Sequence, residues 1–115
     1  MAKWDEMEEW DSEAQSEIVS RVIADFNSGA FGKEFSTKLV ERSLSERDVK
    51  LAIVSRRSLI GRYSHLGQER IGFWQPNTGV FVAWKPTLPT RIVSAFERHD
   101  GENYFRNLDA EPIRR

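Results

Sequence analysis

Side chains that exchange protons or bind phosphate recur along the chain, in or beside its expected strands and helix ends. They are Lys38, Arg42, Arg56, Arg57, His65, Arg70, Ser94, His99 and Tyr104. Histidine changes its protonation state near neutral pH, and arginine matches phosphate with a rigid fork of donors. Together such groups could cleave RNA without a metal ion. That reaction needs a base for the 2'-hydroxyl proton, a cation for the charged phosphorane and an acid for the leaving 5'-oxygen.

The two histidines each have a second interpretation. His65 lies in RYSHLGQ, which reads as a turn, where a histidine is commonly a solvated polar residue. His99 lies in the loop RHDG, where Asp100 either orients the imidazole ring or simply forms a turn with it. The proton-transfer role is therefore open between His65 and His99, with Lys38 as a further catalytic candidate.

Ser94 and Tyr104 are expected to position a substrate. Strand alternation in RIVSAF puts Ser94 on the same face as Ile92 and Phe96, where a hydroxyl group needs a hydrogen-bonding partner. That partner is either the neighbouring backbone or a ligand.

The cationic candidates for binding RNA phosphates lie along most of the chain. They are Arg42, Arg57, Arg70 and Arg91. Lys38 and Arg42 stand four residues apart, on one face of an expected helix, and such a pair is often only a solvated surface. Trp84 is expected either to pack on the sheet or, if exposed, to stack a base.

The usual cofactor motifs are missing from the sequence. There is no cysteine, no HExxH and no cluster of histidines, so the sequence predicts no metal site. GxGxxG, GxxxxGK[ST] and GxSxG are absent as well, so no cofactor is expected.

Charge is distributed unevenly along the 115 residues. Residues 1–17 carry one lysine and seven acids, with Trp4 and Trp10 among them, whereas residues 18–115 carry 16 basic and 11 acidic side chains. We expect an acidic, Trp-bearing arm at 1–17 and one domain at 18–115. The excess of basic side chains in residues 18–115 favours an anionic partner such as nucleic acid, although a surface charge of similar size is also typical of ordinary soluble domains. No apolar run is long enough for a membrane span, so no membrane partner is expected.

The hydrophobic pattern changes from helical to strand-like near residue 57. Helices are expected over 12–29, 31–43 and 44–55, the last capped by Ser45 with Asp48 at its third position. SLIGRYSHLG reads as a short strand and turn, ERIGFW and VFVAW as a hairpin joined by QPNTG, RIVSAF as another strand, and ENYFRNL as a last short strand or turn. The sequence predicts an α+β fold, with two or three N-terminal helices packed on an antiparallel sheet of about four strands.

Three stretches together carry a resemblance to a known group. VERSLSERDVKLAIVS, GFWQPNTGVFVAW and RIVSAFERHDGENYFRNL resemble the small bacterial and phage ribonuclease toxins that include barnase, EndoU, colicin D and RelE-like domains. In that group a helix of the form ER-x-(I/L)-S-x-x-D-V-x-x-A-I precedes a hairpin, and a late strand like IVTAF ends near the active site. The similarity covers about residues 35–108 and rests on short motifs.

The resemblance implies roles for several of the candidate residues. Ser94 stands where a strand Thr or Ser often contacts the scissile phosphate, and Lys38 or Arg42 stands where a cation or histidine faces the concave side of the sheet. Many relatives have a histidine on that helix, and this chain has none there. Either Lys38 replaces it, His65 or His99 has taken over its task, or catalysis has been lost.

From these observations we expect a metal-independent endoribonuclease-like hydrolase, a toxin or phage effector that cleaves RNA by 2'-OH transesterification. It would act in the cytoplasm, either delivered into a target cell or expressed from a phage. Its expected partners are RNA and a cognate inhibitor or immunity protein. The alternative is a non-enzymatic bacterial or phage interaction protein that binds a protein partner through the acidic, Trp-bearing arm. A third possibility is RNA binding without cleavage.

Overall fold

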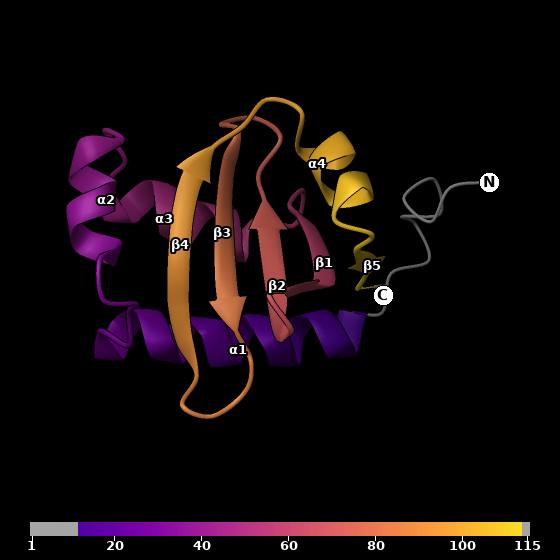
Figure 1. Cartoon of the computed structure of the whole chain (residues 1–115), viewed down its shortest axis with the longest axis horizontal. Helices are drawn as coiled ribbons and strands as arrows, with labels where there is room; N and C mark the ends of the chain where they lie inside the picture. Colours follow the sequence, from indigo (N-terminus) through magenta and orange to yellow (C-terminus); the bar gives the residue numbers. More distant parts are fainter. Residues whose placement is uncertain (1–11, 114–115) are drawn as a thin grey trace.

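A computed structural model describes the backbone of residues 12–113 and the side chains of residues 16–113. Three helices come first: α1 (Ser12–Ser28), α2 (Phe35–Glu41) and α3 (Glu46–Val54). They are followed by β1 (Leu59–His65), β2 (Gln68–Trp74), β3 (Val80–Lys85), β4 (Arg91–Glu97), α4 (Gly101–Asn107) and β5 (Glu111–Pro112). The α+β class with helices ahead of an antiparallel sheet is confirmed (Figure 1).

The acidic arm expected at 1–17 lies mostly outside the described residues, as do the side chains of Trp4 and Trp10. α1 already begins at Ser12, so the boundary expected between residues 17 and 18 falls inside this helix. The arm's expected role in binding a protein partner stays a prediction.

The helix boundaries follow local side-chain chemistry. Ser45 caps α3: its hydroxyl accepts from the Asp48 N–H at 3.1 Å, and the Asp48 carboxylate accepts from the Ser45 N–H at 3.0 Å. This reciprocal pair satisfies two backbone donors that a helix start leaves free. α1 ends at Ser28, before Gly29, whose φ of 75° is a left-handed conformation that glycine adopts without a steric penalty. Both boundaries are as the sequence predicts.

The strands form one antiparallel sheet in the order β4-β3-β2-β1-β5. Neighbours in sequence pair with each other along β1 to β4, as expected for strands joined by short turns. The predicted hairpin is β2 and β3, with Gly72 opposite Ala83. β5 adds a short fifth strand beside β1.

One face of the sheet is covered by α1 and α3, which pass behind it in Figure 1. Side chains alternate between the two faces of a strand. Val82 and Trp84 therefore point toward these helices, and both are buried. The Trp84 indole Nε1–H donates to the Asp25 carboxylate of α1 at 2.8 Å, which ties this face to the helical layer.

The opposite face is partly covered by α4. Phe81 points to this side and contacts Phe105 of α4, with 5.2 Å between ring centroids. Phe81 also fills the space above Gly72, where an added Cβ would lie 2.4 Å from its ring. The part of this face that α4 leaves uncovered carries the candidate site.

The segment ENYFRNL is a helix, and the expectation of a last strand or turn there is wrong. Phe105 is fully buried against the sheet, and Arg106 pairs with Glu102 one helical turn earlier at 2.8 Å. The Trp74 ring packs against Gly101, the first residue of the helix. A Cβ on Gly101 would lie 2.0 Å from the ring, so only glycine permits this docking.

The outer edge of β4 is protected by two other segments. Residues 30–32 run beside it, where the Gly32 N–H donates to the Ile92 carbonyl at 2.7 Å and the Ile92 N–H donates to the Ala30 carbonyl at 2.9 Å. Farther along, the Arg42 guanidinium donates to the Ala95 carbonyl at 2.7 Å. Such coverage blocks an edge strand from pairing with another chain.

Candidate functional site

The open face of the sheet holds a cavity of about 260 Å³. It is lined by Tyr63, His65, Arg70, Ala83, Val93, Ser94, Phe96 and Tyr104. Four residues predicted from the sequence are therefore brought together: His65, Arg70, Ser94 and Tyr104. None of the lining residues that the structure describes is acidic, so the fixed charge on the wall is the Arg70 cation.

Strand register explains why distant residues meet in this cavity. Tyr63 and His65 are two positions apart on β1, so they share a face, and Arg70 of β2 lies directly opposite Tyr63. Ser94 of β4 lies opposite Ala83 of β3 and joins the wall from the other side. Tyr104 reaches the cavity from α4.

A β-bulge shapes the β4 wall. The register between β3 and β4 shifts at Ala83 and Trp84, so that Val93 is the extra residue. Neighbouring residues of a regular strand point to opposite faces, yet Val93 and Ser94 both line the cavity. Ser94 shares the cavity face with Phe96, as simple alternation predicts, and the bulge adds Val93 to that face. Ile92 instead lies opposite Trp84 and is buried, so the expectation that it shares the face of Ser94 is wrong.

Arg70 is held at the cavity by its own strand. Its guanidinium donates to the Gln68 side-chain oxygen at 2.9 Å and to the Glu69 carbonyl at 3.1 Å. The Glu69 carboxylate pairs instead with Arg62 at 2.9 Å. Arg70 therefore bonds neutral oxygens, and its charge is available to a phosphate group.

Tyr63 is a site residue that the sequence reasoning missed. Burial raises the pKa of Tyr63, and the neighbouring Tyr104 adds to this, while the Arg70 cation acts in the opposite direction. The phenol therefore stays protonated at neutral pH and can donate a hydrogen bond inside the cavity. The sequence did hold a signal for it: Tyr63 stands two residues before His65 on one strand, so both side chains lie on the same face.

Phe96 supplies an aromatic surface on the cavity wall. Its ring stacks on Phe81 with centroids 5.0 Å apart and forms a T-shaped contact with Tyr104 at 5.8 Å. Half-buried and facing the cavity, it can stack a base. Trp84, the residue for which the sequence left that role open, is 0% exposed and packs in the core, so it does not present a stacking surface.

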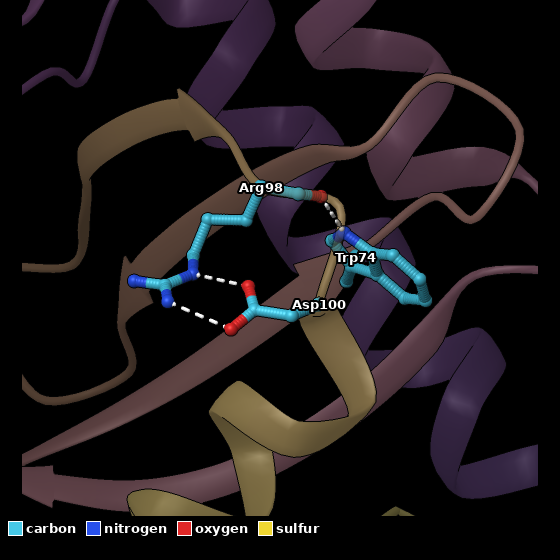
Figure 2. A network of polar contacts seen from close by, with 3 residues as sticks. All are labelled: Trp74, Arg98 and Asp100. Atoms are coloured by element: carbon cyan, nitrogen blue, oxygen red, sulfur yellow. Dashed lines mark hydrogen bonds and ion pairs between the residues drawn. The ribbon is translucent and has the colours of Figure 1, made fainter.

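His99 lies apart from this cavity. Its side chain is 81% exposed and its Nε2 lies 3.2 Å from the Glu97 carboxylate. It lines a second hollow, of about 220 Å³, beside Trp74 and the start of α4. Of the two roles left open for Asp100, orienting the His99 ring is not the one found, because that carboxylate binds Arg98 instead (Figure 2).

The remaining cationic candidates also lie outside the cavity lining. Lys38 pairs with Glu41 at 3.3 Å, and Arg42 binds the edge of β4 and lies over the Phe96 ring at 5.8 Å. Arg57 is exposed in the turn after α3, and Arg91 is exposed at the start of β4. The structure therefore does not gather Lys38 and His99 with Arg70 and Ser94, and a role for these outer cations in binding RNA stays a prediction.

Among residues 12–113, no three of the described His, Asp or Glu side chains lie together as a protein metal site would require. None of the helices in that range has the length and apolar character needed to cross a membrane. No protein-family model, curated protein or solved structure matches this chain.

Proposed function

We propose that the cavity is the active site of a metal-independent endoribonuclease. The observation that carries the proposal is the convergence of His65, Arg70, Ser94 and Tyr104 around one cavity whose described lining residues include no acid. Proton exchange, phosphate binding and hydrogen-bond donation are then available within one small space.

The reaction is transesterification at one RNA phosphate. His65 takes the proton of the 2'-hydroxyl, whose oxygen forms a bond to phosphorus. The bond from phosphorus to the 5'-oxygen breaks, and the Tyr104 hydroxyl gives that oxygen a proton. Arg70 stabilises the charge of the phosphorane between these events. The products are a 2',3'-cyclic phosphate and a 5'-hydroxyl end.

The other wall residues position the substrate. Ser94 and the neutral phenol of Tyr63 donate hydrogen bonds to phosphate or ribose oxygens, and Phe96 stacks a base. Arg42, whose guanidinium lies over the Phe96 ring, extends the cationic surface beyond the cavity. In this proposal the chain acts in the cytoplasm on RNA, as a toxin or phage effector with an inhibitor or immunity protein as its partner.

Cleavage in EDTA tests the proposal. The full chain is incubated with tRNA and ribosomal RNA, and any oligonucleotide found to be cut is remade with a 2'-deoxy sugar at the cut site. We expect cleavage of the RNA that EDTA leaves unchanged, products with 2',3'-cyclic phosphate ends, and an intact 2'-deoxy substrate. RNA binding without products, steeply dependent on salt, would contradict cleavage and favour a binding module.

A pair of arginine variants locates the activity. Arg70→Gln removes the cavity cation and is expected to lower cleavage at least ~100-fold, the usual effect of losing a donor that stabilises transition-state charge. Arg47→Gln removes an exposed cation from α3, on the far side of the sheet, and should leave cleavage unchanged. Equal losses from both variants would place the reaction elsewhere.

A further inference from the structure

Arg98 is fixed at the junction between β4 and α4 through both of its backbone groups. Its N–H donates to the Gly79 carbonyl at 2.6 Å, and its carbonyl accepts from the Trp74 indole Nε1–H at 2.8 Å. Its guanidinium donates twice to the Asp100 carboxylate, at 2.8 and 2.9 Å (Figure 2). A two-bond fork of this kind fixes orientation as well as distance.

Asp100 contributes its carboxylate to this pair although it stands at the N-cap of α4. Aspartate at an N-cap commonly accepts a hydrogen bond from a backbone N–H of the first turn. Here the Asp100 side chain makes no such cap bond. The hydrogen bonds from Arg98 lower the pKa of Asp100, so the pair is fully charged at neutral pH. The carboxylate therefore orients Arg98 instead of capping the helix.

The oriented guanidinium lies against Tyr104. Its central carbon is 4.1 Å from the centroid of the Tyr104 ring, a close cation–π contact. Phe81 and Phe96 form T-shaped contacts with the same ring, with centroids 5.2 and 5.8 Å away. Tyr104 is thus held by two rings and one cation while its side chain lines the cavity.

We propose that Arg98, oriented by Asp100, is a positioning residue that sets the place of the Tyr104 hydroxyl in the cavity. The inference rests on the proposed ribonuclease function, in which Tyr104 protonates the leaving 5'-oxygen. Arg98 does not line the cavity and touches no substrate; it acts through the tyrosine ring. Proton transfer is sensitive to displacements of about 1 Å, so losing this contact lowers turnover more than binding.

Kinetic measurements in the unchanged chain and in Tyr104→Phe distinguish a positioning role of Arg98 from a role in stability alone. Arg98→Met keeps an unbranched apolar stem but removes the guanidinium group, and with it the two hydrogen bonds to Asp100 and the charge. We expect it to lower kcat about 10-fold or more with little change in KM. In Tyr104→Phe, which already lacks the hydroxyl, the same change should not lower kcat further. Arg106→Met, which removes an ion pair from the same helix, serves as the control and should leave kcat unchanged.

Two results would overturn the inference. One is an equal fall in kcat from Arg98→Met in both backgrounds, which would indicate a general weakening of α4. The other is a change in KM alone, which would indicate direct contact with RNA.

A second measurement does not depend on cleavage. Nuclear Overhauser contacts between the ring protons of Tyr104 and Phe96 are recorded in the unchanged chain, Arg98→Met and Arg106→Met. Weaker contacts in Arg98→Met alone are expected, and unchanged contacts there would refute the positioning role. If the unchanged chain cleaves no RNA, the proposed function fails, while this measurement still decides whether Arg98 positions the tyrosine.

Discussion

Replacing Arg42 by alanine tests whether this cation stabilises the edge of β4. Arg42 and Lys38 are two cations four residues apart at α2, and the sequence assigns both to the site. In the structure the Arg42 guanidinium donates to the Ala95 carbonyl at 2.7 Å and lies 5.8 Å from the centre of the Phe96 ring. Lys38 makes only an exposed pair with Glu41, at 3.3 Å.

The expected cost follows from these contacts. A hydrogen bond from a charged donor contributes about 1.5–3 kcal/mol, and a cation–π contact at an exposed site adds about 0.5–1 kcal/mol. Because Arg42 is largely exposed, we take the lower part of this range and expect Arg42→Ala to lower the free energy of unfolding by ~2 kcal/mol. The exposed Lys38 pair should be worth less than about 0.5 kcal/mol.

Urea denaturation of the two variants measures the difference. Arg42→Ala should have its unfolding midpoint at a clearly lower urea concentration, with the same dependence of the unfolding free energy on urea. Lys38→Ala should have the midpoint of the unchanged chain. RNA binding is measured on the same samples. If Arg42→Ala keeps full stability but binds RNA more weakly, the edge argument is wrong and the residue contacts RNA, as the sequence predicts.

Three further predictions concern the layers around the cavity. Gly101→Ala places a Cβ 2.0 Å from the Trp74 ring and should cost about 1–3 kcal/mol in urea denaturation; unchanged stability would show that α4 shifts freely on the sheet. Asp25→Ala leaves the buried Trp84 indole N–H without its 2.8 Å partner and should cost about 1–3 kcal/mol by the same assay, and a neutral effect would contradict the role given to this bond. The raised pKa of Tyr63 implies that the unfolded chain loses the phenol proton first, near the ordinary value of 10.0. Its contribution to stability is therefore complete below that pH and falls above it, by up to ~1.4 kcal/mol per pH unit, and Tyr63→Phe should remove this part of the alkaline decline; an identical decline in both chains would refute it.

The predicted architecture is confirmed where the signals are local. The Ser45–Asp48 capping box depends on residues three apart, and the β2–β3 hairpin on a five-residue connection containing Pro, Asn and Gly. Helix α4 was missed because its formation depends on tertiary docking. The Trp74 ring, 27 positions before Gly101 in the sequence, occupies the space that a side chain at Gly101 would fill.

The candidate site was only partly predictable for a similar reason. Alternation along β1 and β4 can bring His65 and Ser94 to one face, but the choice of His65 over His99 depends on where β4 ends and how α4 turns away. The bulge at Val93 leaves no clear mark in the sequence, since it arises from pairing with β3. In the sequence, Tyr63 and Phe96 look like ordinary strand residues, because nothing local indicates that the face on which they lie is left open.

Metal-free RNA cleavage by two histidine variants tests the central claim, that the cavity on the open face is the active site. In EDTA, His65→Ala should lower the cleavage rate by at least ~100-fold, the usual contribution of a general acid or base, because it removes the imidazole from the cavity wall. His99→Ala, which changes a side chain that is 81% exposed beside Glu97, should cleave as the unchanged chain does. Loss of cleavage in His99→Ala with normal cleavage in His65→Ala would contradict the account.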